Sequence, residues 1–249
     1  MTPLASEYRA RPMTELTVLM PVFNERETVE TAIQRTLEAD MGVDERELLI
    51  VDDGSTDGTA EILQRDWPGP VRVVSHDRNM GKGAAIQTGL QHAAGRYTTV
   101  MDADLEYDPA EVVDLVMPLV RGEAEAVFGV RGFQAHNAYS FWYVVGNRGV
   151  TFAANLLYNC WLGDLMTCHK AIRTDLFRSL PLREPGFAIE AEITARLVRQ
   201  GVRIFEVPVT YRARGREEGK KLEAMDGVRT LRTLMRCRFD AAGRKNGGA

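Results

Sequence analysis

The 249-residue chain has few cysteines. There are three, Cys160, Cys168 and Cys237, and none forms a CxxC pair. Such a sparse, odd set excludes a dense disulfide framework and a zinc site built on paired cysteines. We therefore expect reduced thiols and a cytoplasmic location.

Long hydrophobic runs and excess positive charge are also absent. No stretch reaches the length of about 18 apolar residues that a membrane-spanning helix needs, and the polar segment 1–15 does not resemble a signal peptide or an anchor. The formal net charge is −4, whereas general nucleic-acid binders usually need an excess of Lys and Arg. We expect no transmembrane helix and no nucleic-acid partner.

The first half of the chain alternates short β-branched runs with amphipathic stretches. This alternation predicts right-handed βαβ units, and therefore an α/β domain around a mostly parallel sheet. The expected strands are 16–20, 47–51, 71–75, 97–101 and 126–130, and the expected helices are 27–40, 58–66, 83–94 and 110–121. After residue 131 we expect helices at 139–162, 188–200 and 222–239, a strand at 203–207 and a charged loop at 212–221.

Polar residues gather where the predicted strands end. Asn24 and Glu25 follow the first strand and Asp53 the second, while residues 79–83 follow the third and Asp102 the fourth. Ligands of open parallel sheets bind outside the carboxyl ends of the strands. Four consecutive strand ends with such groups predict a binding site along this edge.

Asp102 and Asp104 are the most informative pair. Residues i and i+2 of a strand lie on one side, and two adjacent carboxylates repel unless a cation lies between them. We expect Mg²⁺ or Mn²⁺, which accept one or two carboxylates and complete their coordination with water and substrate phosphate. The alternative is a strand-end turn in which aspartates make local hydrogen bonds.

Two further segments are ambiguous. Asp53 can accept hydrogen bonds from a base or a ribose, whereas the following Ser55–Gly58 can simply cap a helix. Residues 79–83, Asn-Met-Gly-Lys-Gly, are consistent with a phosphate cradle or with an ordinary helix start.

The segments Pro-Val-Phe-Asn-Glu at 21–25, Val-Asp-Asp-Gly-Ser-Thr-Asp-Gly-Thr at 51–59 and Asp-Ala-Asp-Leu-Glu at 102–106 resemble family 2 glycosyltransferases with the GT-A fold. The likeness runs from about residue 16 to 238. Within this family, the chain most resembles the branch of dolichol-phosphate mannose synthases and polyprenyl-phosphate glycosyltransferases. It implies a single GT-A domain at 16–240, with a Rossmann-like nucleotide-sugar-binding half at 16–131 and an acceptor half at 132–240. We expect a flexible segment at 1–15 and a disordered tail at 241–249.

The resemblance also implies roles for individual residues. Residues that would hold the nucleoside are Pro21, Phe23, Glu25, Val51 and Asp53. Residues that would meet the diphosphate and the metal are Asp102, Ala103 and Asp104, with Glu106 as a further metal ligand in place of the family's usual Gln. Residues that would contact phosphate and act in catalysis beside Asp104 are Arg131, Arg214 and Lys220. The loop carrying the last two departs from the synthases' Gly-Glu-Ser-Lys wording, and the synthases' C-terminal membrane helices are absent from this sequence.

The implied reaction is inverting transfer of a hexose from a GDP- or UDP-sugar to a polyprenyl phosphate. A phosphate monoester is largely ionised at neutral pH and needs no general base. A sugar or small-molecule hydroxyl, the alternative acceptor, would need one, and Glu190 and Glu192 are the candidates unless they only favour a helix N-terminus. A non-catalytic nucleotide-sugar-binding protein is the third possibility, which the intact motifs disfavour.

An aromatic segment at 141–162 and a basic amphipathic helix near the C-terminus admit two interpretations. Trp and Tyr suit the lipid headgroup region, so the segment can contact a membrane peripherally at its cytoplasmic face, or a membrane partner subunit. It can equally be core or the face of a homo-oligomer. For Leu231, Leu234, Met235 and Phe239 in the last helix, packing on the sheet is the alternative to lipid contact.

Overall fold

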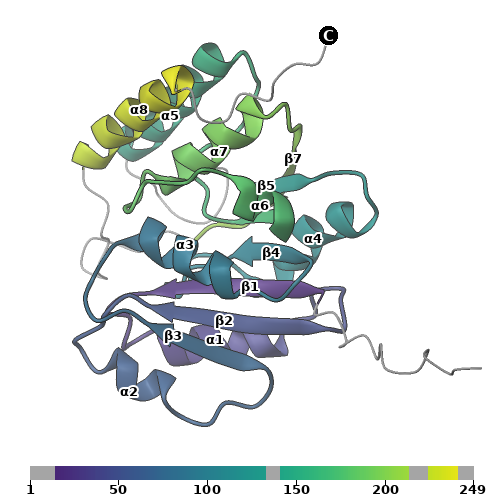
Figure 1. The fold of residues 1–249 in the computed structure, drawn as a ribbon, viewed down its shortest axis with the longest axis vertical. Helices are drawn as coiled ribbons and strands as arrows, with labels where there is room; N and C mark the ends of the chain where they lie inside the picture. Colours follow the sequence, from purple (N-terminus) through teal and green to yellow (C-terminus); the bar gives the residue numbers. More distant parts are fainter. Residues whose placement is uncertain (1–14, 133–140, 213–223, 241–249) are drawn as a thin grey trace, which may run out of the picture.

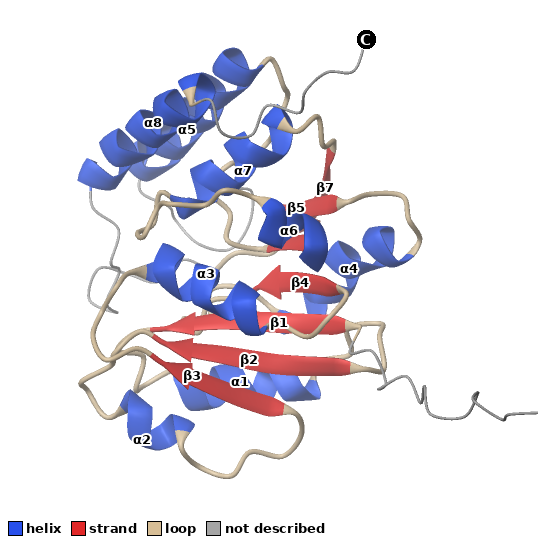
Figure 2. Ribbon diagram, viewed as in Figure 1, coloured by secondary structure: helices blue, strands red, loops and turns tan. Residues whose placement is uncertain are grey.

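Seven strands form one mixed sheet in the part of the chain that the computed structural model describes, residues 15–132, 141–212 and 224–240 (Figures 1 and 2). Their order across the sheet is β3-β2-β1-β4-β6-β5-β7. The strands are β1 (Leu16–Val22), β2 (Arg46–Asp52), β3 (Val71–Ser75), β4 (Tyr97–Val100), β5 (Ala126–Arg131), β6 (Lys170–Arg173) and β7 (Ile204–Val209). This arrangement confirms the α/β class and every strand expected from the sequence.

Strand β6 was not expected. It runs antiparallel to both β4 and β5, whereas the other neighbouring pairs are parallel. Its four residues, Lys-Ala-Ile-Arg, begin and end with a cationic side chain, so the sequence lacks the apolar run that marks a buried strand. Burial between two strands stabilises it despite this composition.

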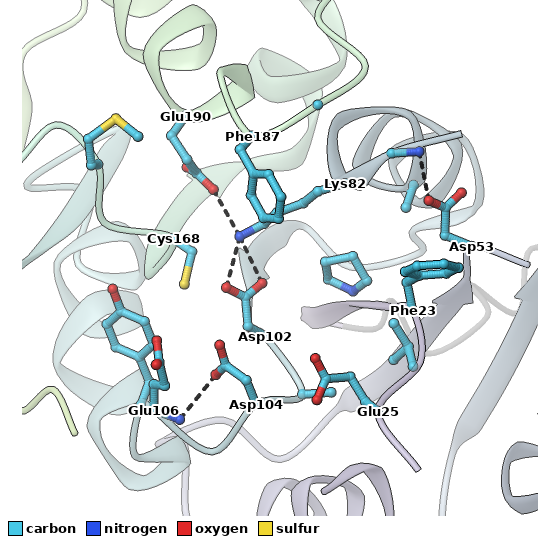
Figure 3. Close-up of a pocket in the computed structure, with 18 of the residues that line it drawn as sticks. Phe23, Glu25, Asp53, Lys82, Asp102, Asp104, Glu106, Cys168, Phe187 and Glu190 are labelled. Carbon is cyan, nitrogen blue, oxygen red and sulfur yellow. Dashed lines mark hydrogen bonds and ion pairs between the residues drawn. The ribbon is translucent and has the colours of Figure 1, made fainter. Parts of the chain in front are cut away.

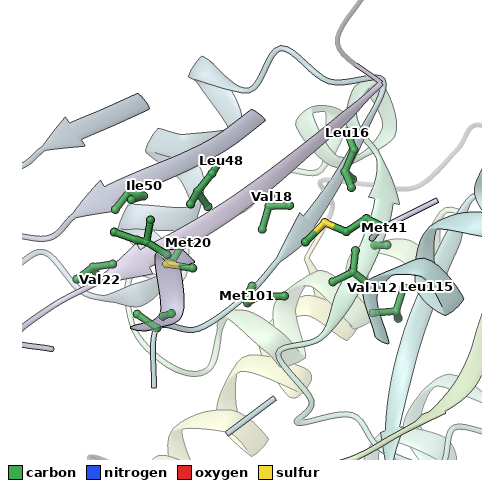
Figure 4. Packing of buried hydrophobic residues seen from close by; sticks show 14 of the residues in the cluster. Leu16, Val18, Met20, Val22, Met41, Leu48, Ile50, Met101, Val112 and Leu115 are labelled. Atoms are coloured by element: carbon green, nitrogen blue, oxygen red, sulfur yellow. The ribbon is translucent and has the colours of Figure 1, made fainter. Parts of the chain in front are cut away.

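Side chains of β1 alternate between two cores. Leu16, Val18 and Met20 face one cluster, which α1 and α4 cover (Figure 4). Leu19 faces a second cluster, which α3, α6 and α7 cover. Sheets buried on both faces have nearly continuous apolar strands, and β1, with the sequence Leu-Thr-Val-Leu-Met-Pro-Val, is of this kind.

The helices match the expected pattern, apart from the short α6, which was not expected. They are α1 (Val29–Glu38), α2 (Thr59–Leu63), α3 (Lys82–His92), a 3₁₀ turn (Pro109–Glu111) leading into α4 (Val112–Val120), α5 (Phe141–Tyr158), α6 (Thr174–Ser179), α7 (Ile189–Arg199) and α8 (Ala224–Phe239). Within the described segments, no helix is both long and apolar enough to cross a membrane.

Helices α5 and α8 form an outer layer on α7 (Figure 1). Val150 and Ala154 of α5 and Leu234 of α8 pack there against Ala191 and Ala195. The last helix, α8, thus packs on other helices. The alternative considered from the sequence, packing of α8 on the sheet, is wrong. Of the segments expected to be flexible or disordered, 1–15 and 241–249, all but residue 15 lie outside the described residues.

Candidate active site

A cavity of about 410 Å³ opens at the carboxyl ends of β1, β2 and β4 (Figure 3). The predicted edge of the sheet is therefore the edge that is hollowed. Of the residues expected to bind substrate or metal, those that line it are Pro21, Phe23, Glu25, Asp53, Asp102, Ala103, Asp104, Glu106 and Arg131. Arg214 and Lys220 lie outside the described residues.

The turn after β4 carries Asp102 and Asp104 into the cavity. Leu105 has a φ of 62°, a left-handed conformation whose cost is on the order of 1–3 kcal/mol for a residue other than glycine. The backbone N–H of Glu106 donates to Asp104 Oδ1 at 3.0 Å. Together these features fix the direction in which the two aspartates point.

Lys82, the first residue of α3, reaches across the cavity floor to Asp102 (Figure 3). Its Nζ lies 2.8 Å from each carboxylate oxygen of Asp102 and 3.3 Å from Glu190 Oε1. Burial lowers the pKa of Lys82, but Asp102 and other acidic neighbours outweigh burial and raise that pKa well above its usual value. Burial in turn raises the pKa of Asp102, and Lys82 outweighs it, so that pKa lies below its usual value. Both groups are therefore charged at neutral pH.

Asp53 fixes the loop between β3 and α3. Its Oδ1 accepts from the backbone N–H of Met80 at 2.9 Å and lies 2.7 Å from His76 Nδ1, while its Oδ2 accepts from the N–H of Gly81 at 2.7 Å. Gly81 has a φ of 99°, a conformation that favours glycine. Much of the accepting capacity of Asp53 is thus used to shape this wall of the cavity.

The residues predicted to hold the nucleoside fall into two groups, those that line the cavity and one that is buried in the core. Pro21, Phe23 and Glu25, at the end of β1, line the cavity. Val51 does not: its side chain is fully buried in the second core cluster, between the sheet and α3. The Val51 side chain therefore contributes packing at the end of β2.

Arg131 ends β5 inside the cavity wall and is almost fully buried. Its guanidinium makes a bidentate pair with Asp164, 2.6 Å from Nε and 2.9 Å from Nη2. It also lies 4.9 Å from the ring centroid of Tyr211. Asp164, which is 1% exposed, is therefore the buried partner of Arg131.

The two glutamates at the start of α7 have different surroundings. Glu190 lines the cavity, with Oε2 2.6 Å from Lys170 Nζ and Oε1 facing Lys82. Glu192 accepts from the backbone N–H groups of Arg183 and Glu184, at 2.7 Å and 2.6 Å, and does not line the cavity. Of the two candidate bases, only Glu190 is placed to meet a substrate.

Some of the lining residues carry no sequence signal. Tyr107, Cys168, Phe187 and Tyr211 come from loops and strand ends of both halves, and only tertiary contact brings them together. Burial raises the pKa of the Cys168 thiol well above its usual value, so this cysteine is a neutral wall residue.

The donor set fits a hard divalent cation. Asp102 and Asp104 supply carboxylate oxygens at one point of the cavity, while Glu106 Oε2 accepts a hydrogen bond from Tyr211 at 2.6 Å. Among the described residues, no group of three or more His, Cys, Asp or Glu side chains is arranged to hold a metal by itself. This is the arrangement expected for Mg²⁺ or Mn²⁺, which keep positions open for water and phosphate.

Comparison with known proteins agrees with the expected family. Dodecaprenyl-phosphate galacturonate synthase of Rhizobium johnstonii is 38% identical over 122 residues, 47% of this chain and 36% of that protein. Dolichol-phosphate mannosyltransferase of Pyrococcus furiosus is 27% identical over 230 residues, 89% of this chain and 64% of that protein. The chain spans between about a third and two thirds of the length of such curated relatives.

A solved structure has the same fold. Glucosyl-3-phosphoglycerate synthase of Mycobacterium tuberculosis, in complex with Mn²⁺, uridine diphosphate and phosphoglyceric acid, has a TM-score of 0.67 and 26% identity, and the match covers 94% of this chain and 81% of that chain. Residues 17–180, most of the chain, match the family model described as Glycosyl transferase family 2. The chain therefore belongs to glycosyl transferase family 2 and has a GT-A-like fold.

Proposed function

We propose that the protein is an inverting, metal-dependent hexosyltransferase that moves a sugar from a GDP- or UDP-linked donor to a polyprenyl phosphate. The observation that carries the donor half of this proposal is the pair Asp102 and Asp104 inside the cavity that Phe23 and Glu25 also line. Support for the acceptor comes from the curated relatives, whose names include a dodecaprenyl-phosphate and a dolichol-phosphate transferase.

Asp102 and Asp104 would hold Mg²⁺ or Mn²⁺, and Glu106, the third expected ligand, would have to turn from Tyr211 to join them. Such an ion neutralises the charge of a nucleoside diphosphate leaving group. Pro21, Phe23 and Glu25 would hold the nucleoside, with Asp53 shaping the adjoining wall. Arg131, Arg214 and Lys220 would contact phosphate. In this proposal residues 16–131 bind the donor and residues 132–240 the acceptor.

The surroundings of Glu190 favour a phosphate acceptor over a hydroxyl. A hydroxyl nucleophile needs a base that accepts its proton. Glu190 lies between the ammonium groups of Lys170 and Lys82, 2.6 Å and 3.3 Å away. Protonating it would leave Lys170 without its carboxylate partner and would leave Lys82 with Asp102 alone of its two carboxylate neighbours. A phosphate monoester, already ionised, places no such demand on the site.

An exposed apolar surface suits a protein that works on lipid. Helices α5 and α8 lie side by side (Figure 1), and the exposed large apolar side chains on and beside them are Val145, Phe152, Leu156, Trp161, Val228, Leu231, Met235 and Phe239. Exposed arginines of α8, among them Arg232 and Arg238, flank this surface and complement anionic headgroups. We therefore place the protein at the cytoplasmic face of a membrane as a peripheral protein; a membrane partner subunit or a second copy of the chain is the competing occupant.

A transfer assay tests the proposal. The protein is incubated with a panel of nucleotide sugars, with or without Mn²⁺, and with either a short polyprenyl phosphate or 3-phosphoglycerate. We expect transfer to the polyprenyl phosphate, dependent on Mn²⁺, abolished in Asp104→Ala and retained in Asp114→Ala, an exposed aspartate on α4. Metal-independent transfer, or full activity of Asp104→Ala, contradicts the metal role; transfer only to phosphoglycerate contradicts the acceptor.

A further inference from the structure

Lys82 occupies the place of a counter-cation beside Asp102. Its Nζ is equally close to both carboxylate oxygens, at 2.8 Å (Figure 3). The side chains are 11% and 21% exposed, so little water shares this contact. A lysine ammonium acts as a compact point charge. It balances Asp102 without any help from a bound ligand.

The backbone that carries Lys82 is held on both sides. The N–H of Gly81 donates to Asp53 Oδ2 at 2.7 Å. A Cβ atom at Gly81 or at Gly83 would collide with the backbone at Pro185 or Glu184, which shows how closely the start of α3 approaches that segment. Lys82 can therefore leave Asp102 only by rotating its long side chain, while its Cα stays in place.

This pairing conflicts with metal binding to the protein alone. Because both oxygens of Asp102 already face the ammonium, any divalent ion bound by this carboxylate would have the ammonium as a near neighbour. Cations so close repel strongly where water is scarce. The diphosphate of a donor changes the balance, since its oxygens bring negative charge with which an ammonium pairs well.

We propose that Lys82 makes binding of the divalent ion conditional on the donor: without a nucleoside diphosphate its ammonium competes with the ion for Asp102, and with one it moves to the diphosphate and frees that carboxylate. Lys82 is then a positioning residue that couples the donor site to the metal site. The inference rests on the metal-dependent function proposed above.

Mn²⁺ binding, followed by the electron paramagnetic resonance signal of free Mn²⁺, tests the coupling without any turnover. The wild-type protein, Lys82→Met and Lys82→Arg are titrated with Mn²⁺ alone and with saturating uridine diphosphate or guanosine diphosphate, after correction for Mn²⁺ bound by free nucleotide. For the wild type we expect Mn²⁺ to bind about 5- to 150-fold more tightly with nucleotide, the usual range of such couplings. Lys82→Met should bind Mn²⁺ alone about tenfold more tightly, and its coupling should shrink. Lys82→Arg, which keeps the charge, should keep weak binding of Mn²⁺ alone.

Each outcome has a distinct meaning. If the wild type binds Mn²⁺ equally well with and without nucleotide, or if a folded Lys82→Met binds Mn²⁺ alone no more tightly, the inference is wrong while the metal-dependent function stands. If the wild type binds no Mn²⁺ even with nucleotide, the proposed function fails as well. Thermal unfolding of both variants establishes whether they are folded. If a variant is not folded, the comparison of wild-type Mn²⁺ binding with and without nucleotide still tests the inference.

Discussion

The carboxylate of Asp164 grips the guanidinium of Arg131 through two hydrogen bonds, of 2.6 Å and 2.9 Å. Both side chains are at least 95% buried. Removing one partner of such a pair leaves a buried charge alone, so we expect Arg131→Gln to lower the free energy of unfolding by about 3–5 kcal/mol. Urea unfolding at neutral pH measures this loss.

A double variant separates stability from chemistry at this pair. Replacing Asp164 with Asn in the Arg131→Gln background removes the stranded charge, so part of the lost stability should return. If Arg131 contacts a substrate phosphate, sugar transfer stays low in the double variant. Transfer that recovers along with stability would make Arg131 a structural residue only.

Replacing Glu190 or Glu192 with glutamine separates an effect on sugar transfer from an effect on stability. For a phosphate acceptor, we expect Glu190→Gln to slow transfer by less than the factor of about 10² to 10⁴ that removal of a general base causes. Both changes should cost stability, because the fully buried Lys170 loses its partner Glu190 and the fully buried Arg196 loses its partner Glu192. Turnover and urea unfolding are measured for both; a loss of more than 10²-fold (roughly) in Glu190→Gln alone would indicate a hydroxyl acceptor.

His169 makes folding sensitive to acid. Burial lowers its pKa to about 4, and neither ring nitrogen has a hydrogen-bond partner among the described residues. The unfolded chain takes up this proton near pH 6.5, so stability is lost as pH falls from about 6.5 toward 4. At pH 5 the loss amounts to about 2 kcal/mol relative to pH 7. In His169→Phe this part of the pH dependence should vanish; unfolding curves at the two pH values that differ as much as in the wild type would contradict the prediction.

Two helical glycines offer a matched comparison. At Gly83, in α3, a Cβ atom would collide with the carbonyl oxygen of Glu184; at Gly149, in α5, it would meet nothing within 4 Å. We expect Gly83→Ala to lower the free energy of unfolding by about 1–3 kcal/mol. Gly149→Ala should raise it by about 0.5–1 kcal/mol, because alanine favours helix. Denaturant titration of both variants checks the two signs.

The apolar surface of α5 and α8 should bind anionic vesicles. Leu156, Trp161 and Phe239 are 76%, 89% and 75% exposed, and replacing all three with serine should weaken binding to phosphatidylglycerol vesicles by at least about tenfold. Phe205→Ser, an exposed phenylalanine on β7, is the control and should bind as the wild type does. If the triple variant binds vesicles as the wild type does, the surface is not a lipid contact. If the wild type is a dimer and the triple variant a monomer, the surface binds a second copy of the chain.

Much of the fold was predictable because local patterns dominate it. The apolar runs that form β1 and β2 are buried on both faces, and the turns after β2 and β4 place Asp53 and Asp102 at the same edge of the sheet. Strand β6 and the cavity residues Cys168 and Phe187 were not predictable. Neighbours distant in sequence create their environment, and a single chain carries no local mark of such contacts.

The structure gathers most of the predicted site residues around one cavity, but the prediction missed several contacts there. The spacing of Asp102 and Asp104 placed them at a strand end. No local sequence pattern indicates that Lys82 forms an ion pair with Asp102 or that Asp164 forms one with Arg131. Ion pairs between residues tens of positions apart depend on how elements pack. Val51 shows the converse: a residue inside a family motif whose side chain belongs to the core.

The close approach of α3 to residues 184–185 has a consequence for changing what the protein recognises. The backbone that carries Lys82 and the segment that leads to Glu190 touch without room for a methyl group between them. A substitution that reshapes one side of this junction will displace the other. If the two sides of this junction bind donor and acceptor as proposed, the two preferences are linked through it, and variants selected for a new sugar should also be screened for a changed acceptor.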